Sequence, residues 1–365
     1  MLNNKLLVFL IAAVLVLALP LVMPMVGLGP GWVRILALAL LYVLLALGLN
    51  IVVGYAGLLD LGFVAFYAIG AYMFGLLSSG HLTETFEWIR QGFPNGLHTP
   101  FWLVIPLAAL VAALAGALLG APTLKLRGDY LAIVTLGFGE IIRVFLTNLD
   151  SPVNITNGPK GIGPIDTMRL PVVDFDLGKT HSLLGMDVPP ATNYYYLFLA
   201  LVVLGVFVCS RLERSRIGRA WMAIREDEVA AKAMGINTRN MKLLAFSMGA
   251  SFGGVSGVLF AGYQVFITPE AFSLQESVMI VAMIVVGGIG HLPGVILGAL
   301  LLAALPEVLR YVVGDVQNLT GGRIDASILR QLLVALAMIT VMLLRPRGLW
   351  PSAEHGKAAP APVVK

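Results

Sequence analysis

Residues 32–54 read WVRILALALLYVLLALGLNIVVG, an apolar run in which Arg34 is the single charged side chain. About 20 consecutive apolar residues are enough for a helix to cross the hydrocarbon core of a membrane. The same composition extends through the chain: of its 365 residues, 58% are hydrophobic and only 12% are charged. A soluble domain has about 25% charged residues. The sequence therefore predicts an all-α polytopic membrane protein.

Ten apolar runs are candidate transmembrane helices. They cover residues 6–27, 32–54, 58–77, 101–121, 129–148, 194–209, 241–263, 276–288, 294–313 and 327–344. The first run could also be a secretory signal peptide, but its length and its prolines, Pro20 and Pro24, favour a retained helix. The eighth run is short, so it could be tilted, broken or enclosed by protein.

The basic residues predict the orientation of the chain, because Lys and Arg are retained in cytoplasmic loops. Ten crossings that begin inside place 15 of the 24 Lys and Arg residues on one side. That side includes Lys125, Arg127, the segment 210–242 and the region from Arg345 onward. Both termini are therefore expected in the cytoplasm. This placement also explains the net charge of +4 more simply than binding of nucleic acid does.

Two segments outside the spans have distinct characters. Residues 149–193 are too polar for a span, and their prolines and glycines predict an extracytoplasmic cap of short strands or turns. Residues 352–365 are rich in Ala and Pro and are expected to be a disordered tail. Residues 1–351 then form a single transmembrane domain.

Several chemical functions are disfavoured by the sequence. Cys209 is the single cysteine, so no disulfide can form within the chain, and the five histidines are too scattered for a metal site. Gly178-Lys179-Thr180 ends like a phosphate-binding loop but lacks the glycine that such a loop needs five residues earlier, where Val173 stands. The chain is not expected to be an enzyme or to hold a cofactor.

The inner segment 210–242 contains eight cations and four acids, so it lies in water or against another protein. Acids at the start and Gly235 at the end predict a helix over residues 226–234. It could be a solvated connector or a surface helix that docks into a soluble partner. The candidate docking residues are Arg225, Glu226, Asp227, Glu228, Ala230, Ala231 and Gly235.

Residues 229–235, VAAKAMG, resemble the coupling loop of ATP-binding cassette (ABC) importer permeases, which carries Glu-Ala-Ala, three residues and Gly. Here the acid is displaced to Glu228. A narrower resemblance extends across nearly the whole chain and keeps one family's order. It is carried by GYAGLLDLGFVAFYAIGAYM (54–73), TLGFGEIIRVFLTN (135–148), TNGPKGIGPI (156–165), RAWMAIREDEVAAKAMGI (219–236), VVGGIGHLPGVILGALL (285–301) and LRPRGLW (344–350). Together these segments resemble the branched-chain amino acid ABC permease family.

The resemblance implies about ten transmembrane helices in a vitamin B12 importer permease-like bundle in a bacterial cytoplasmic membrane. It also implies a second permease subunit in a heterodimer, two cytoplasmic ATPase subunits that carry ATP-Mg, and an extracytoplasmic substrate-binding protein. Branched-chain or related hydrophobic amino acids are the implied cargo. Urea, short amides, a sugar or another small polar solute are alternatives, and a stand-alone secondary transporter or channel is a further one.

Charged and aromatic residues within the spans are candidates for the translocation path, because a charge inside the bilayer costs about 2.5–3.5 kcal/mol on insertion scales. Glu140 and Arg143 are three residues apart on one helical face, so they could contact substrate or pair with each other. Glu307 and Arg310 have the same spacing, and an interfacial pair is favoured there. The other path candidates are Asp60, Phe63, Phe66 and Tyr67, for which a helix cap and ordinary packing are the alternatives.

Two glycine-containing features concern contacts between segments. On the outer side, Asn157, Gly158 and Lys160 are candidates for docking the binding protein, although turn chemistry would select the same residues. Within the spans, glycines four residues apart predict close helix packing, since small residues let backbones approach. These glycines are 116 and 120; 249, 253 and 257; and 294 and 298.

Overall fold

The computed structural model describes residues 16–23, 30–94, 96–123, 128–170, 175–183, 186–319, 326–345 and 348–350. The larger helices are α2 (Pro30–Asn50), α3 (Val64–Leu77), α6 (Phe101–Thr123), α7 (Asp129–Asn148), α8 (Pro190–Glu213), α11 (Thr238–Gln264), α12 (Leu274–Gly287), α13 (Leu292–Leu319) and α14 (Ala326–Leu344). The short helices are η1 (Ile51–Tyr55), α4 (His81–Thr85), α5 (Glu87–Gly92), η2 (Gly158–Lys160), α9 (Arg216–Glu226), α10 (Glu228–Ala233) and η3 (Pro269–Phe272). The strands are β1 (Arg169–Leu170), β2 (Phe175–Asp176), β3 (His181–Leu183) and β4 (Met186–Val188).

The helices are those of a multi-pass membrane protein. In the described part of the chain, six helices are long and apolar enough to cross a membrane, and three shorter apolar helices accompany them. Each expected span from the second onward corresponds to one of these helices. The expected first span lies mostly outside the described residues, of which 16–23 are helical. Lys125, Arg127 and the expected tail, 352–365, also lie outside the described residues.

Two expected boundaries were wrong. The third span was expected from residue 58, but residues 58–63 are not helical and α3 begins at Val64. The backbone turns at Gly57, whose φ of +69° is incompatible with a continuing right-handed helix. The inner segment is also shorter than 210–242, because α8 continues to Glu213 and α11 begins at Thr238.

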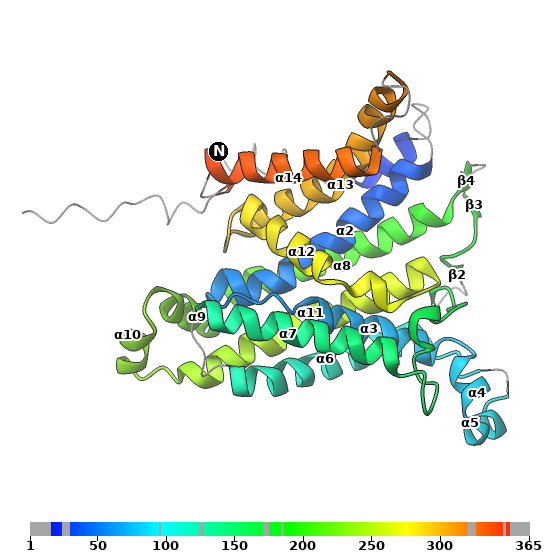
Figure 1. The fold of residues 1–365 in the computed structure, drawn as a ribbon, viewed down its shortest axis with the longest axis horizontal. Helices are drawn as coiled ribbons and strands as arrows, with labels where there is room; N and C mark the ends of the chain where they lie inside the picture. The colour runs from blue at the N-terminus through cyan, green and yellow to red at the C-terminus, as the bar shows by residue number, and fades with distance from the viewer. Residues whose placement is uncertain are drawn as a thin grey trace, which may run out of the picture.

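Helix α2 lies at the centre of the bundle (Figure 1). It packs against α8, α11, α12 and α13, and 78% of the residues in its most apolar stretch are buried. A helix that is apolar on every side is typical of such a central position. The run of residues 32–54 therefore faces protein more than lipid.

Helix α11 packs closely against α6 and α3 through glycines. A Cβ atom on Gly257 would collide with the carbonyl oxygen of Tyr67, and one on Gly70 would collide with that of Gly254. At these glycines, the backbones of α3 and α11 are in direct contact, with no side chain between them. The expectation of small-residue packing is confirmed at this interface.

Gly257→Ala is expected to destabilise the protein by about 1–3 kcal/mol, because the added methyl group overpacks the contact between α11 and α3. Gly137→Ala is the matched control, since a Cβ there meets nothing within 4 Å. The control gains helix propensity of up to about 1 kcal/mol. Thermal unfolding of the purified protein in detergent measures both effects. Equal midpoints for the two variants would contradict the packing argument.

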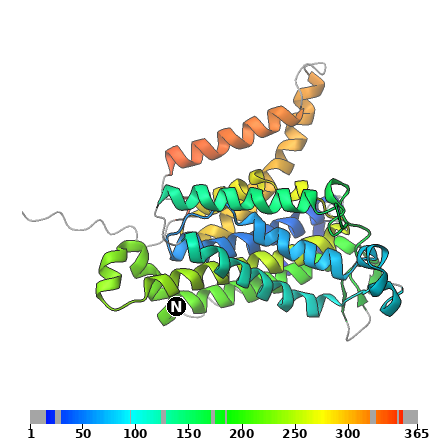
Figure 2. The ribbon, with the colours of Figure 1, turned by 60° about the horizontal axis from the view of Figure 1, so that its bottom comes forward.

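The bundle has two distinct ends, with α9 and α10 at one and α4, α5 and the strands at the other (Figures 1 and 2). At the end with the strands, Ile162 pairs with Ile267, and the amide of Asp166 donates to Ser78. At the opposite end, the amide of Trp350 donates to Gly287. Each set of connections ties its own end of the bundle together. We call these the outer end (strands) and the inner end (α9 and α10).

Helical residues 16–23 are joined to α8 by two tyrosines. The hydroxyls of Tyr195 and Tyr196 donate to the carbonyl oxygens of Val16 and Leu17, at 2.8 and 2.9 Å. Pro20 has no N–H, so the carbonyl of Val16 lacks its usual helical donor four residues on. Tyr195 supplies the missing hydrogen bond.

Candidate functional site

The inner segment is built from two helices that meet at Asp227. The Asp227 backbone is extended, with φ −154° and ψ 111°, so it ends α9 and caps α10. Its carboxylate accepts hydrogen bonds from the amides of Val229 and Ala230, at 2.8 and 3.0 Å. The expected single helix over residues 226–234 was therefore wrong at its start. Glu226 closes α9, and α10 begins at Glu228.

The end of α10 follows the sequence expectation. Gly235 has a φ of +85°, its amide donates to Lys232, and the amide of Ile236 donates to Ala231. This pair of bonds is the Schellman arrangement that commonly ends a helix at glycine. The chain then turns directly into α11, so the length and direction of α10 are fixed at both ends.

Three side-chain contacts join this segment to the membrane helices. The buried indole of Trp221 donates to the carbonyl of Met241, at 2.7 Å. The ammonium of Lys242 lies 2.8 Å from the carboxylate of Glu228. Arg225 donates to the carbonyl of Gly54, at the inner end of the central helix. Helices α9 and α10 are therefore attached both to the start of α11 and to η1.

The outward face of α10 is partly apolar. Val229 is 68% exposed and Met234 is 84% exposed, whereas Ala231 is buried. Glu226, Asp227, Ala230 and Gly235 are also exposed. Exposed apolar side chains on a segment that is held to the membrane helices through its opposite face make that segment a candidate docking surface. We call Val229 and Met234 the α10 knob.

Inside the bundle, the turn at residues 60–62 precedes α3. Asp60 is 1% exposed, and its carboxylate accepts from the amide of Gly62 at 2.9 Å. The hydroxyl of Thr135, on α7, accepts from the amide of Leu61, whose carbonyl accepts from Ser277 on α12. The turn is thus held between α7 and α12. Asp60 and Thr135 also line an apolar pocket of about 290 Å³.

The aromatic path candidates are core residues. Phe63, Phe66 and Tyr67 are each at most 3% exposed, and the ring of Tyr67 packs against those of Phe260 and Phe272. Of the three, Phe66 also lines the pocket beside Asp60. Their positions correspond to the packing alternative.

Glu140 and Arg143 pair with each other on α7, with the guanidinium 2.8–2.9 Å from the carboxylate. Both side chains are about one-third exposed, at 34% and 38%. Most residues of α7 are not buried within this chain, so this partly exposed pair can contact a neighbouring subunit or solvent. The other predicted pair involves Arg310, whose side chain lies outside the described residues.

At the outer end, two of the residues predicted to dock the binding protein form a turn, and the third is exposed. Asn157 adopts a left-handed conformation with φ 60°, accepts through its backbone oxygen from Lys160, and donates from its side chain to Gly161 at 2.7 Å. Gly158 is buried with a φ of +53°. These two residues build the turn, as the turn-chemistry alternative proposed. Lys160 is exposed and can contact a partner.

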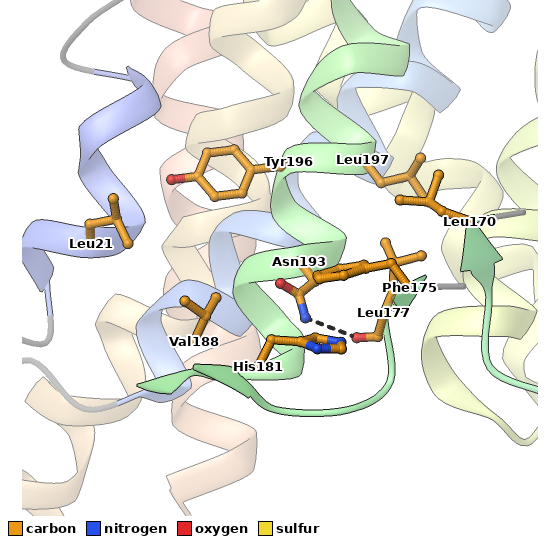
Figure 3. Close-up of a pocket in the computed structure, with 9 residues that line it drawn as sticks. All are labelled: Leu21, Leu170, Phe175, Leu177, His181, Val188, Asn193, Tyr196 and Leu197. Carbon is orange, nitrogen blue, oxygen red and sulfur yellow. Dashed lines mark hydrogen bonds between the residues drawn. The ribbon is translucent and has the colours of Figure 1, made fainter. Parts of the chain in front are cut away.

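The expected cap contains two antiparallel hairpins, β1–β2 and β3–β4. Between this cap, α8 and Leu21 lies an apolar pocket of about 520 Å³ (Figure 3). Phe175 and His181 stack at its base, with ring centroids 3.8 Å apart. Asn193 donates from α8 to the carbonyl of Leu177, which holds the cap against the helix.

Asp176 is the polar centre of the cap. Burial alone raises the pKa of this carboxyl group. Hydrogen bonds from Thr167 (2.7 Å) and the amide of Gly178 (2.9 Å), with the charges of Arg169 and Lys179, reverse that effect and lower the pKa below its ordinary value. A carboxyl group with a lowered pKa in the folded state stabilises the fold above its unfolded pKa of about 3.9. That stabilisation is lost as the pH falls through the lowered value.

The Asp176→Asn variant is expected to loosen the cap at neutral pH by about 1–2 kcal/mol, because hydrogen bonds to the charged carboxylate are lost. Hydrogen exchange of residues 175–183, followed by mass spectrometry, measures this opening. In the unaltered protein, exchange beyond the intrinsic pH effect rises only when the pH falls into the acid range. The exposed Asp187→Asn variant is the control. Equal protection in both variants would contradict the role of Asp176.

Sequence reasoning missed the residues that depend on long-range contacts. Lys242 and Trp221 anchor the inner segment, and Tyr42 donates to Glu276 between α2 and α12, at 3.0 Å. For Lys242, the available signal in the sequence was a lysine at the start of an apolar span. For Glu276, the signal was a carboxylate in an otherwise apolar run.

Comparison with known proteins identifies the family of the chain. Residues 31–343 match the family described as branched-chain amino acid transport system / permease component. The chain is 41% identical over 331 residues to the high-affinity branched-chain amino acid transport system permease protein LivM of Escherichia coli K12, covering 88% of this chain and 70% of that protein. It is 26% identical over 330 residues to the probable branched-chain amino acid transport permease protein LivM of Methanocaldococcus jannaschii. This match covers 85% of this chain and 90% of that protein.

A second type of permease is also similar. The high-affinity branched-chain amino acid transport system permease protein LivH of Salmonella typhimurium is 26% identical over 266 residues, covering 72% of this chain and 79% of LivH. No solved structure matches the chain.

Proposed function

Because the chain belongs to the branched-chain amino acid transport permease family, we propose that it is the membrane permease subunit of an ABC importer. It moves branched-chain or related hydrophobic amino acids into the cell, and partner subunits bind ATP-Mg and hydrolyse it. The chain itself catalyses no reaction. Urea and short amides are the alternative cargoes.

The observation that carries this proposal is the anchored inner segment. A motor outside the membrane can move a permease only through a part that it grips and that is tied to the membrane helices. The α10 knob offers the grip, and Lys242 and Trp221 provide the ties to α11. ATP binding then shifts the population between inward-open and outward-open states by favouring one of them.

The proposed topology has ten crossings in a vitamin B12 importer-type bundle, with both termini in the cytoplasm of a bacterium. The separation of α9 and α10 from the strands at opposite ends supports it (Figure 1). The basic segment between α8 and α11 supports a cytoplasmic inner end, since Lys and Arg are retained in cytoplasmic loops.

The proposed assembly contains a second permease, two cytoplasmic ATPases and an extracytoplasmic binding protein. Similarity to both LivM and LivH supports a pair of different permeases. The ATPases dock on the segment that contains Arg225, Glu226, Asp227, Glu228, Ala230, Ala231 and Gly235, and they contact its exposed side chains while Ala231 packs inward. The binding protein lands on the outer end, where Lys160 is exposed.

Reconstitution tests this function. The chain is placed in proteoliposomes with its second permease, ATPases and binding protein, and uptake of labelled leucine is measured with and without ATP. We expect uptake that requires ATP and every partner. The purified chain alone is expected to show no flux driven by an ion gradient. Gradient-driven flux through the chain alone would instead favour a secondary transporter or channel.

A further inference from the structure

A chamber of about 540 Å³ lies between α2, α12, α13 and α14. This volume falls within the range of about 300–1,000 Å³ that is usual for small-molecule sites. The chamber walls are mostly apolar and include three methionines, which adapt readily to aliphatic groups. Its polar lining residues are Tyr42, Gln275, Glu276, Glu307 and Gln331. Because they come from helices far apart in the chain, no sequence motif marks the chamber.

Glu276 is held in a defined position within this chamber. The hydroxyl of Tyr42, on the central helix, donates to its carboxylate at 3.0 Å. The next residue, Ser277, donates to the carbonyl of Leu61 at 2.6 Å, which fixes the start of α12 against the interior turn. Glu276 lies in the first turn of α12, where the helix dipole favours a negative charge. The carboxylate is therefore a built feature of the bundle interior.

The charge of the chamber selects its ligand. Among the described side chains that line it, two are carboxylates, Glu276 and Glu307, and none is a lysine or arginine. A charge inside the membrane is costly and is usually found on a substrate or ion path. An ammonium group offers the complementary charge, and the methionine walls suit an aliphatic group attached to it.

We propose that this chamber is a binding site for an aliphatic amino acid, with its ammonium group at Glu276 and its side chain along the methionines. The site is separate from the pocket beside Asp60, which is lined from α3, α6, α7 and α11. This inference rests on the proposed transport function and deepens it, because it names a site where the transported amino acid binds within the permease. Tyr42 positions the carboxylate that receives the cargo.

The test uses the complete complex in proteoliposomes. Glu276→Gln keeps the side-chain shape and removes the charge, and is expected to lower leucine uptake about tenfold, equivalent to about 1.4 kcal/mol. Glu270→Gln is the matched control, since Glu270 is an exposed acid on η3 outside the chamber lining, and its uptake is expected to stay unchanged. Assembly is checked by co-purification. If Glu276→Gln does not assemble, Tyr42→Phe, which removes one hydroxyl, is expected to lower uptake.

A second measurement reads occupancy directly. Gln331→Cys lies in the chamber lining, and Ile339→Cys on the same helix is exposed outside it. Leucine is expected to slow reaction of the first cysteine, but not the second, with a small thiol reagent. Glu276→Gln should remove this protection.

The outcomes separate the two proposals. No leucine uptake by the unaltered complex overturns the transport function and, with it, the assignment of the chamber. Normal uptake by Glu276→Gln, or labelling of the Gln331→Cys variant that leucine does not slow, overturns the chamber alone.

Discussion

Lys242→Met is expected to uncouple ATP hydrolysis from leucine uptake. Lys242 is buried at the start of α11, and its contact with Glu228 ties α10 to a membrane helix. Methionine has a similar length and keeps the packing, so the protein is expected to fold. Coupling between two sites is typically worth about 1–3 kcal/mol, which corresponds to about 5- to 150-fold. Uptake per ATP hydrolysed should therefore fall by at least about tenfold.

Two variants make this result specific. Arg239→Met removes an exposed cation from the first turn of α11, outside α10, and is expected to leave uptake unchanged. Exchanging the charges, with Glu228→Lys and Lys242→Glu together, is expected to restore part of the coupling. Uptake and ATPase activity are measured on the same proteoliposomes. If Lys242→Met remained as well coupled as Arg239→Met, the ion pair would have no part in transmission.

The transmembrane helices could be predicted from sequence because their signal is local. A run such as residues 32–54 specifies a buried helix by its composition alone. The end of α10 was likewise predictable, since Gly235 is read from one residue and the conformation it favours. The end of the second span, expected at residue 54, lies within one residue of the end of η1 at Tyr55, but the third span was expected from residue 58 and α3 starts only at Val64.

The candidate site was predictable only in part, because its contacts join distant residues. The acids at residues 226–228 were expected to face a partner, yet Asp227 caps α10 and Glu228 pairs with Lys242. Fourteen positions separate Glu228 from Lys242, and no helical spacing links them. Glu276 and Tyr42 are separated by 234 residues, so only the fold brings them together. Composition indicates that a polar residue in a span needs a partner, but topology decides which one.

Met234→Glu is expected to release the ATPases from the permease while leaving the permease folded. Met234 is 84% exposed, so a charge there is expected to change the stability of the chain by at most about 0.5 kcal/mol. In the assembly, the same side chain would enter a cleft of the partner. An anchor of this kind typically contributes about 2 kcal/mol or more to binding, which weakens the affinity about 30-fold when it is lost.

Asn240→Glu provides the control for charge, because it adds an acid at an exposed position on the same end, in the first turn of α11. Co-purification of the ATPases with the tagged permease measures binding, and a thermal unfolding curve checks the fold. We expect Met234→Glu alone to lose the ATPases and the uptake. The carboxylates of Asp227 and Glu228 already bind groups of this chain, so we expect the apolar knob to supply most of the contact energy. Full retention of the ATPases by Met234→Glu would show that the motor grips another surface.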